Sequence, residues 1–241
     1  MKKIKSLSII VPCYNEEGTL KDIVKEVLGI DIGHIEKEII LIDDCSTDGT
    51  IRIIKSLAEK HPEIKAFYQG KNQGKGAALK VGFNNSTGDL VIVQDADREY
   101  DPRDYKKLIN LFSEDRADVV IGSRFSGGQP KRVAYLANTI ANKFMTRLSA
   151  LMSGLYVSDI HSCYIMFDGE WIRRKAPSLK SKRYGFNPEI IAKIANEKNT
   201  LRICEVGISY FPRTKEEGKK IGVRDGLKAL WEIFYYNTLS R

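Results

Sequence analysis

Short apolar runs with the residue types of β-strands alternate along the chain with segments of helical periodicity. The run Leu7 to Val11 precedes a segment in which Leu20, Ile23 and Val27 share one helical face. This alternation is typical of an α/β fold, with a mostly parallel central sheet and helices on both faces. We expect one Rossmann-like domain over residues 1–241, since no linker or repeat divides the chain. The other expected strands are residues 38–42, 64–68, 90–93, 118–122, a segment ending at 167, and 201–210.

The apolar strand that begins after Gly88 ends in two carboxylates, Asp95 and Asp97, with Ala96 between them. In an extended strand side chains alternate, so the two carboxylates are expected to point the same way. Two carboxylates ~4 Å apart repel by roughly 4 kcal/mol at a partly screened site, which favours a cation between them. Hard oxygen ligands suit Mg²⁺ or Mn²⁺. A polar turn without a metal is the alternative.

Two further polar motifs follow predicted strands, PCYNEE at 12–17 and DDCSTDGT at 43–50. Ligands of parallel sheets bind outside the carboxyl ends of the strands, so the three motifs are predicted to form one site. The glycine-rich segment 70–76 lacks the spacing of a P-loop. It opens a predicted helix, where Lys75 could face a diphosphate. An ordinary surface position for Lys75 is equally compatible.

The formal net charge of +8 is concentrated near the C-terminus, where residues 171–228 hold 15 Lys and Arg against 6 Asp and Glu. Such a region can face nucleic acid, anionic lipid or a phosphorylated substrate. The four cysteines show no CxxC spacing, which argues against a zinc site and for reduced thiols in a cytoplasmic protein. No apolar run approaches the ~20 residues that span a bilayer, so we do not expect an integral membrane protein.

The longest helical pattern runs from Val133 to Met152, with Lys143 and Arg147 off its apolar face. Two positions for this helix are compatible with the pattern: packed on the core, or lying at a membrane surface. The pattern alone favours the core.

Taken together, the motifs resemble the family 2 glycosyltransferases of the glycosyltransferase A fold. The closest likeness is to the branch of dolichyl-phosphate mannose synthases and polyprenyl-phosphate glycosyltransferases. The resemblance covers nearly the whole chain. Beyond the three strand-end motifs it rests on NQGKGAALK, GSRF, SDIHSCY, YGFNPEI and ISYFPRTKEEGKK. Two departures concern donor and acceptor: the chain lacks the C-terminal membrane helices of many members, and its basic loop is longer than in the better-known mannose synthases.

The resemblance implies a role for particular residues of this chain. The base and ribose of a nucleotide-sugar would be held by Pro12, Tyr14, Glu16, Ile42 and Asp44, with Lys75, Asp95 and Ala96 completing the donor site. Asp95 and Asp97, assisted by Glu99, would bind Mg²⁺ or Mn²⁺. Arg124 and Arg132 would face the acceptor phosphate, and Arg213 and Lys219 would close over the phosphates. Asp97, Arg124, Arg213 and Lys219 are accordingly the expected catalytic residues.

The implied activity is inverting transfer of a sugar from GDP-mannose or a UDP-hexose to a dolichyl or undecaprenyl phosphate. We expect a peripheral enzyme at the cytoplasmic membrane face, with a membrane-anchoring subunit or a second copy of the chain as protein partner. Transfer to a saccharide hydroxyl is the alternative; it would need a general base, for which Asp159 and Glu189 are the candidates. For both, a structural anchor is the simpler role. A non-catalytic basic module is a remote alternative, and no nucleic-acid partner is expected.

Overall fold

Seven β-strands form one sheet in the computed structural model, which describes residues 3–133, 136–214 and 223–240. The strand order is β3-β2-β1-β4-β6-β5-β7. β6 is antiparallel to β4 and β5, whereas the other neighbouring pairs are parallel, which confirms the predicted mostly parallel sheet. The strands are β1 (Ser6–Cys13), β2 (Glu36–Asp43), β3 (Ile64–Tyr68), β4 (Leu90–Val93), β5 (Val119–Ser123), β6 (Ile165–Asp168) and β7 (Ile203–Gly207).

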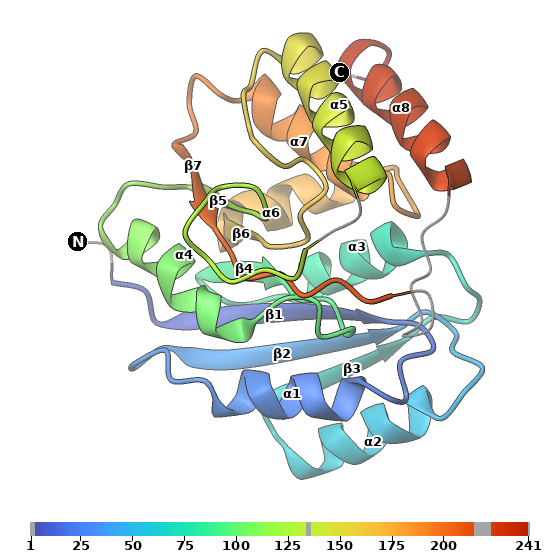
Figure 1. Ribbon diagram of the computed structural model, residues 1–241. Helices are drawn as coiled ribbons and strands as arrows, with labels where there is room; N and C mark the ends of the chain where they lie inside the picture. The colour runs from blue at the N-terminus through green and yellow to red at the C-terminus, as the bar shows by residue number, and fades with distance from the viewer. Residues whose placement is uncertain (1–2, 134–135, 215–222, 241) are drawn as a thin grey trace.

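Helices cover both faces of the sheet, as predicted (Figure 1). One face packs against α1, α2 and α4, and the other against α3, α6 and α7. α5 and α8 lie side by side in an outer layer beyond α7 (Figure 1). The helices are α1 (Leu20–Gly29), α2 (Thr50–Lys60), α3 (Lys75–Asn85), α4 (Tyr105–Ser113), α5 (Leu136–Ser153), α6 (Gly169–Lys175), α7 (Phe186–Asn196) and α8 (Val223–Thr238), with short 3₁₀ turns at Pro102–Asp104 and Ala176–Ser178.

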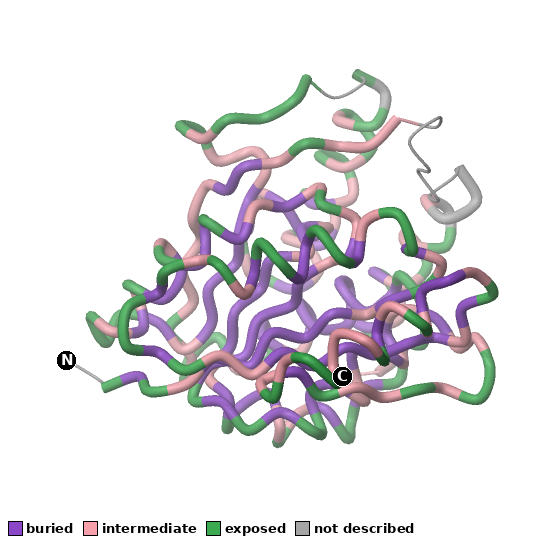
Figure 2. The backbone as a smooth tube through the Cα atoms, turned by 90° about the horizontal axis from the view of Figure 1, so that it is seen from below, coloured by how far each residue is buried: buried purple, intermediate pink, exposed green. Residues whose placement is uncertain are grey.

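The central strands are buried on both faces, which explains their continuous apolar sequences. Side chains alternate along each strand, so Ile9 and Leu41 enter the core beneath α1 and α2. Their neighbours Ile10 and Ile42 enter the core beneath α3 and α7. The strands at the centre of Figure 2 are accordingly almost all coloured as buried. This rigid sheet fixes the strand ends that carry the polar motifs.

The position favoured for the 133–152 helix, packed on the core through its apolar face, is largely wrong. Met145, Leu148 and Met152 do pack against the core. Most of the other predicted core residues are exposed, with exposed fractions of 93% for Val133, 74% for Leu136 and 85% for Leu151. The physical reason is that polar side chains occupy the inward face of α5 and bond to the segment after it. Ile140 and Phe144 are also exposed, whereas Asn142, Thr146, Ser149 and Ser153 are buried or half-buried.

The last strand is shorter than the predicted segment 201–210. β7 ends at Gly207, and Tyr210 instead makes single bridges to Tyr100 and Lys131. The chain thereby leaves the sheet and crosses the carboxyl edge, which carries Arg213 toward the strand-end motifs. Within the ranges that the structure describes, no helix combines the length and hydropathy of a bilayer-spanning segment.

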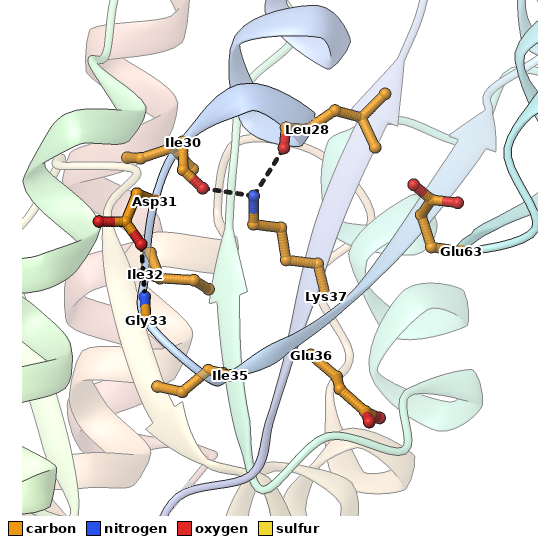
Figure 3. A pocket seen from close by; sticks show the side chains of 9 residues that line it. All are labelled: Leu28, Ile30, Asp31, Ile32, Gly33, Ile35, Glu36, Lys37 and Glu63. Atoms are coloured by element: carbon orange, nitrogen blue, oxygen red, sulfur yellow. Dashed lines mark hydrogen bonds between the residues drawn. The ribbon is translucent and has the colours of Figure 1, made fainter.

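A surface cleft lies at the opposite edge of the sheet, where β2 begins (Figure 3). Lys37 Nζ donates hydrogen bonds there to the carbonyls of Leu28, at 2.7 Å, and Ile30, at 2.5 Å, which caps the end of α1. Asp31 accepts a hydrogen bond from the N–H of Gly33 at 2.9 Å. These polar groups are engaged with the backbone at the amino end of the strands. We therefore assign the cleft a structural role.

Candidate active site

The three polar motifs meet at the carboxyl edge of the sheet, as predicted. β1 and β2 are paired up to Cys13 and Asp43, so the residues that follow each strand leave the sheet together. β4 pairs with β1 on its other side, and its last residue, Val93, lies beside Ile10. The parallel register therefore brings the segments after these strands to one edge.

Three carboxylates from this edge converge on the guanidinium of Arg213. Its Nη1 and Nη2 lie 3.2 Å and 3.3 Å from the carboxylate oxygens of Glu16. Nη2 also lies 3.2 Å from Oδ2 of Asp97, and Nε lies 3.8 Å from Oε1 of Glu99. The backbone N–H of Arg213 donates to Glu99 at 2.8 Å. A single cation thus occupies the centre of the acidic cluster formed by Glu16, Asp97 and Glu99.

Asp95 is held by a different cation. Lys75, the first residue of α3, places its Nζ 2.5 Å from Oδ1 of Asp95 and 2.9 Å from Sγ of Cys163. Burial lowers the pKa of Lys75, but the negative charge of Asp95 outweighs it and raises that pKa well above the ordinary value. Lys75 therefore stays charged and neutralises Asp95.

The alternation argument for Asp95 and Asp97 is a second correction. β4 ends at Val93 and the chain turns at residues 96–97, so the two carboxylates are not successive members of one strand face. They still interact: burial, followed by the negative charges of Asp95 and Glu99, raises the pKa of Asp97 to about 7. The positive charge of Arg213 lowers the pKa of Asp97 and partly offsets this repulsion.

The donor set fits a hard divalent cation, because carboxylate oxygens of Asp97, Glu99 and Glu16 surround one positive charge. In the arrangement described, over residues 3–133, 136–214 and 223–240, no three acidic, His or Cys side chains are close enough together to hold an ion. Arg213 stands between them. Asp95, Asp97 and Glu99 are the carboxylates that the sequence predicts as metal ligands.

The residues expected to hold the nucleotide lie around this edge with different degrees of access. Tyr14 is exposed just after β1. Asp44 accepts hydrogen bonds from the backbone N–H groups of Gln73 and Gly74, both at 2.7 Å. Burial raises the pKa of Asp44 by more than these hydrogen bonds lower it. Ala96 is buried, and Pro12 lies half-buried in β1. The Ile42 side chain is fully buried in the core.

Arg124 and Asp159 form a bidentate ion pair. Nε and Nη2 of the arginine lie 2.7 Å and 2.8 Å from the two carboxylate oxygens, and Asp159 is fully buried. Burial raises the pKa of Asp159, but Arg124 outweighs it and holds that pKa below its usual range. The Arg124 guanidinium also lies 5.0 Å from the ring of Tyr210. The geometry is that of an anchor for Arg124 rather than of a general base.

The remaining predicted residues are placed as follows. Glu189 is buried and accepts the N–H groups of Lys180 and Ser181 at 2.8 Å and 2.7 Å, again an anchoring geometry. Arg132 is exposed, and its Nη1 donates to the carbonyl of Pro212 at 3.3 Å. Lys219 lies outside the described residues.

A model of the family described as Glycosyl transferase family 2 matches residues 8–175. The chain belongs to this family. It is therefore a glycosyltransferase, and the resemblance seen in the sequence motifs is confirmed.

Two similar proteins have dolichyl phosphate in their names. The family 2 glycosyltransferase described here is 27% identical over 244 residues to UDP-N-acetylglucosamine--dolichyl-phosphate N-acetylglucosaminyltransferase of Methanococcus voltae, a match that covers 95% of each chain. It is 29% identical over 230 residues to dolichyl-phosphate beta-glucosyltransferase of Dictyostelium discoideum, covering 89% of this chain and 68% of that protein.

Solved structures share the fold. Mannosyl-3-phosphoglycerate synthase from Rubrobacter xylanophilus superposes with a TM-score of 0.73 at 16% identity, covering 98% of this chain and 74% of that one. Glucosyl-3-phosphoglycerate synthase from Mycobacterium tuberculosis, crystallised with Mn²⁺, UDP and phosphoglyceric acid, gives 0.69 at 18% identity, covering 98% and 78%. At these identities the likeness establishes the fold.

Sequence reasoning missed two contacts of this glycosyltransferase site. Tyr210 donates its hydroxyl to Oε2 of Glu99 at 2.8 Å, and Cys163 contacts Lys75. Both residues stand inside motifs that carry the resemblance, ISYFPRT and SDIHSCY, but no spacing signal singled them out. Burial, followed by the charge of Asp95, raises the pKa of Cys163 to about 12, so its thiol is neutral.

Proposed function

We propose that the chain transfers a sugar, with inversion, from GDP-mannose or a UDP-hexose to a polyprenyl phosphate at the cytoplasmic membrane face. The observation that carries the donor half is the acidic cluster of Glu16, Asp97 and Glu99 at the carboxyl edge of the sheet, held around one cation. The acceptor half is supported by the dolichyl-phosphate names of two relatives that match most of this chain.

The diphosphate of the donor would lie against the acidic cluster. Mg²⁺ or Mn²⁺, when bound by Asp97 with Glu99 and Asp95, neutralises charge on the leaving nucleoside diphosphate. The ion pair with Lys75 orients Asp95 and balances its charge. Arg213 is the cation at the acidic cluster. We expect Arg213 to exchange its carboxylate contacts for the donor phosphates, to which charge-assisted hydrogen bonds are stronger. Lys219, outside the described residues, is the second cation that the resemblance implies for the phosphates.

The acceptor is a phosphate oxygen, which attacks the anomeric carbon of the sugar as the bond from that carbon to the diphosphate breaks. A phosphate monoester is largely ionised at neutral pH, with a second pKa of about 6, so no side chain has to remove a proton. The anchored state of Asp159 and Glu189 supports this choice of acceptor over a hydroxyl. Arg124 and Arg132 are the cations we assign to the acceptor phosphate.

The test is transfer of label from radioactive UDP-glucose, UDP-N-acetylglucosamine and GDP-mannose to undecaprenyl phosphate in detergent, with Mg²⁺, Mn²⁺ or chelator. We expect one donor to give lipid-extractable label that requires metal. Asp97→Asn should lower that transfer by about a hundredfold or more. The matched control is Asp31→Asn, which removes a carboxylate at the opposite edge of the sheet (Figure 3) and should leave transfer unchanged.

Two outcomes would overturn parts of the proposal. Label found only on a saccharide hydroxyl would refute the phosphate acceptor, and it would return Asp159 and Glu189 to consideration as bases. Full activity of Asp97→Asn, with the fold verified by circular dichroism, would refute the site.

A further inference from the structure

An ordinary surface helix turns most of its apolar side chains inward, whereas α5 leaves several of the largest outside. Its inward arc combines Met145, Leu148 and Met152, which pack against the core, with polar residues. The hydroxyl of Thr146 accepts the N–H of Ile160 at 3.4 Å, and Asn142 donates to Asp159 at 3.5 Å. The protein therefore uses the polar side of α5 for tertiary contacts.

The outward arc of α5 carries large apolar side chains. Leu136, Ile140, Phe144 and Leu151 are spaced by four, four and seven positions, which places them on one helical stripe. Their exposed fractions are 74%, 59%, 60% and 85%, and Val133, just before the helix, is exposed at 93%. Several large apolar side chains on one stripe are more than the scattered exposure that is normal for a soluble surface.

The neighbouring helix α8 adds aromatic residues. Trp231 and Phe234 are exposed at 59% and 44%, and their rings lie 5.8 Å apart. α8 runs beside α5 in the outer layer (Figure 1). Exposed tryptophan beside leucine and phenylalanine is the composition of helices that lie in the headgroup region of a bilayer.

The charged residues around this surface indicate what kind of partner binds to it. Residues 125–158 contain four cations, Lys131, Arg132, Lys143 and Arg147, and no Asp or Glu. All four are exposed. Lys143 and Arg147 are on α5 itself, next to or within the apolar stripe. An uncharged protein partner would gain nothing from this one-sided charge, whereas the phosphates of an anionic lipid surface complement it.

The start of the stripe adjoins the active site. The backbone N–H of Arg132 donates to the carbonyl of Tyr210 at 2.9 Å, and its side chain to that of Pro212. Arg213, the next residue, holds the acidic cluster. A bilayer lying against α5 would thus present phosphate headgroups close to the cations assigned to the acceptor.

We propose that the outward stripe of α5, extended by Trp231 and Phe234 of α8, docks onto an anionic phospholipid surface. The proposal deepens the proposed function by naming the face through which the enzyme reaches a membrane-held acceptor. The apolar side chains enter the headgroup region, and Lys143 and Arg147 pair with lipid phosphates. The polar inward arc keeps α5 attached to the protein.

The first test is flotation with vesicles of phosphatidylcholine alone or with about 30% phosphatidylglycerol, in the absence of donor and acceptor. We expect binding to the anionic vesicles that weakens with salt. Ile140→Gln/Phe144→Gln/Leu151→Gln should lower it by about tenfold or more, since three exposed apolar side chains are lost without disturbing the core. Lys143→Gln/Arg147→Gln should weaken binding to anionic vesicles only. The control Tyr68→Gln, an exposed aromatic on β3, should bind as the wild type.

The second test is tryptophan quenching by brominated lipids. The chain has two tryptophans, and Trp171 is buried at 3% exposure, so quenching reports on Trp231. Absence of both flotation and quenching would overturn the proposal. A dimer in light scattering that the triple variant converts to a monomer, without vesicle binding, would show that a second copy covers the stripe instead.

Transfer assays separate this inference from the proposed function. The triple variant should keep activity on a short-chain isoprenyl phosphate dissolved in water and lose it on undecaprenyl phosphate embedded in vesicles. A wild-type protein that floats with vesicles but transfers to neither acceptor would refute the proposed function and leave the docking surface standing. Equal transfer by wild type and triple variant to the embedded acceptor would refute the docking surface alone.

Discussion

His161 offers a quantitative test of the electrostatics beside Arg124. Its Nε2 is buried and, among the residues that the structure describes, has no hydrogen-bond partner. Burial, followed by the positive charge of Arg124, lowers the pKa of His161 from 6.5 to about 4. The folded protein therefore keeps this imidazole neutral at a pH where the unfolded chain protonates it.

The sign follows from linkage. Between about pH 4 and pH 6.5 the unfolded state binds a proton that the folded state does not, so stability is lost as the pH falls through this range. One pKa unit corresponds to about 1.4 kcal/mol, so the loss amounts to about 3 kcal/mol below pH 4 and to about 2 kcal/mol at pH 5. Above about pH 7 this group contributes nothing.

The assay is urea unfolding of wild type and His161→Gln at about pH 7.5 and pH 5. Other titrating groups affect both proteins alike, so the wild type should lose about 2 kcal/mol more than the variant between the two conditions. His34→Gln, at an exposed position, is the matched control and should behave as the wild type. Equal losses in wild type and His161→Gln would refute the claim that folding keeps this imidazole neutral.

Three further predictions concern packing and charge. Gly82→Ala should destabilise the protein by about 1–3 kcal/mol in urea unfolding, because the new Cβ would lie 2.2 Å from Cγ2 of Ile10, whereas Gly29→Ala, with open space, should be tolerated. Glu189→Gln should lower the free energy of unfolding by about 1–3 kcal/mol, because one buried N–H loses its acceptor, yet it should leave transfer per folded molecule intact. Lost transfer would instead indicate that Glu189 acts as a base. Arg213→Ala should abolish transfer. It should also bind Mn²⁺ up to about fivefold more tightly in calorimetry, because an ion pair of about 1 kcal/mol no longer competes with the metal. Unchanged affinity would show that Arg213 does not occupy the metal position.

The sheet and the edge that carries the site could be predicted because both follow from local patterns. Leu7 to Val11 is apolar at nearly every position because β1 is buried on both faces, and that pattern needs no knowledge of distant residues. The parallel register then places the residues after β1 and β2 at one edge. The sequence therefore predicted correctly that the polar motifs at 12–17 and 43–50 lie at one edge of the sheet.

The centre of the site was not derivable from spacing, because its members are far apart in the chain. Arg213 and Glu16 are separated by 197 positions, and the guanidinium reaches the carboxylate only because the chain leaves β7 at Gly207. Nor could strand alternation describe Asp95 and Asp97, since a turn intervenes after Val93. Their different partners, Lys75 and Arg213, come from tertiary structure.

The orientation of α5 could not be predicted for a related reason. Periodicity states which side chains share a face, but it does not state which face turns inward. Here Asn142 and Thr146 face inward and form hydrogen bonds with Asp159 and with the N–H of Ile160. Apolar side chains at these two positions would leave those buried polar groups unpaired. The apolar stripe is the face that remains.

These two arcs of α5 give the helix a combined role. Asn142 on the inward arc bonds Asp159, and Asp159 holds Arg124 in a bidentate pair beside Tyr210. The outward arc, on our proposal, rests on lipid. Docking would then fix in one step the position of a membrane-held phosphate and of the arginine assigned to meet it. A displaced α5 would loosen both, so an Asn142→Ala variant should lower transfer to embedded and to short-chain acceptors alike, whereas loss of the outward stripe should affect the embedded acceptor only.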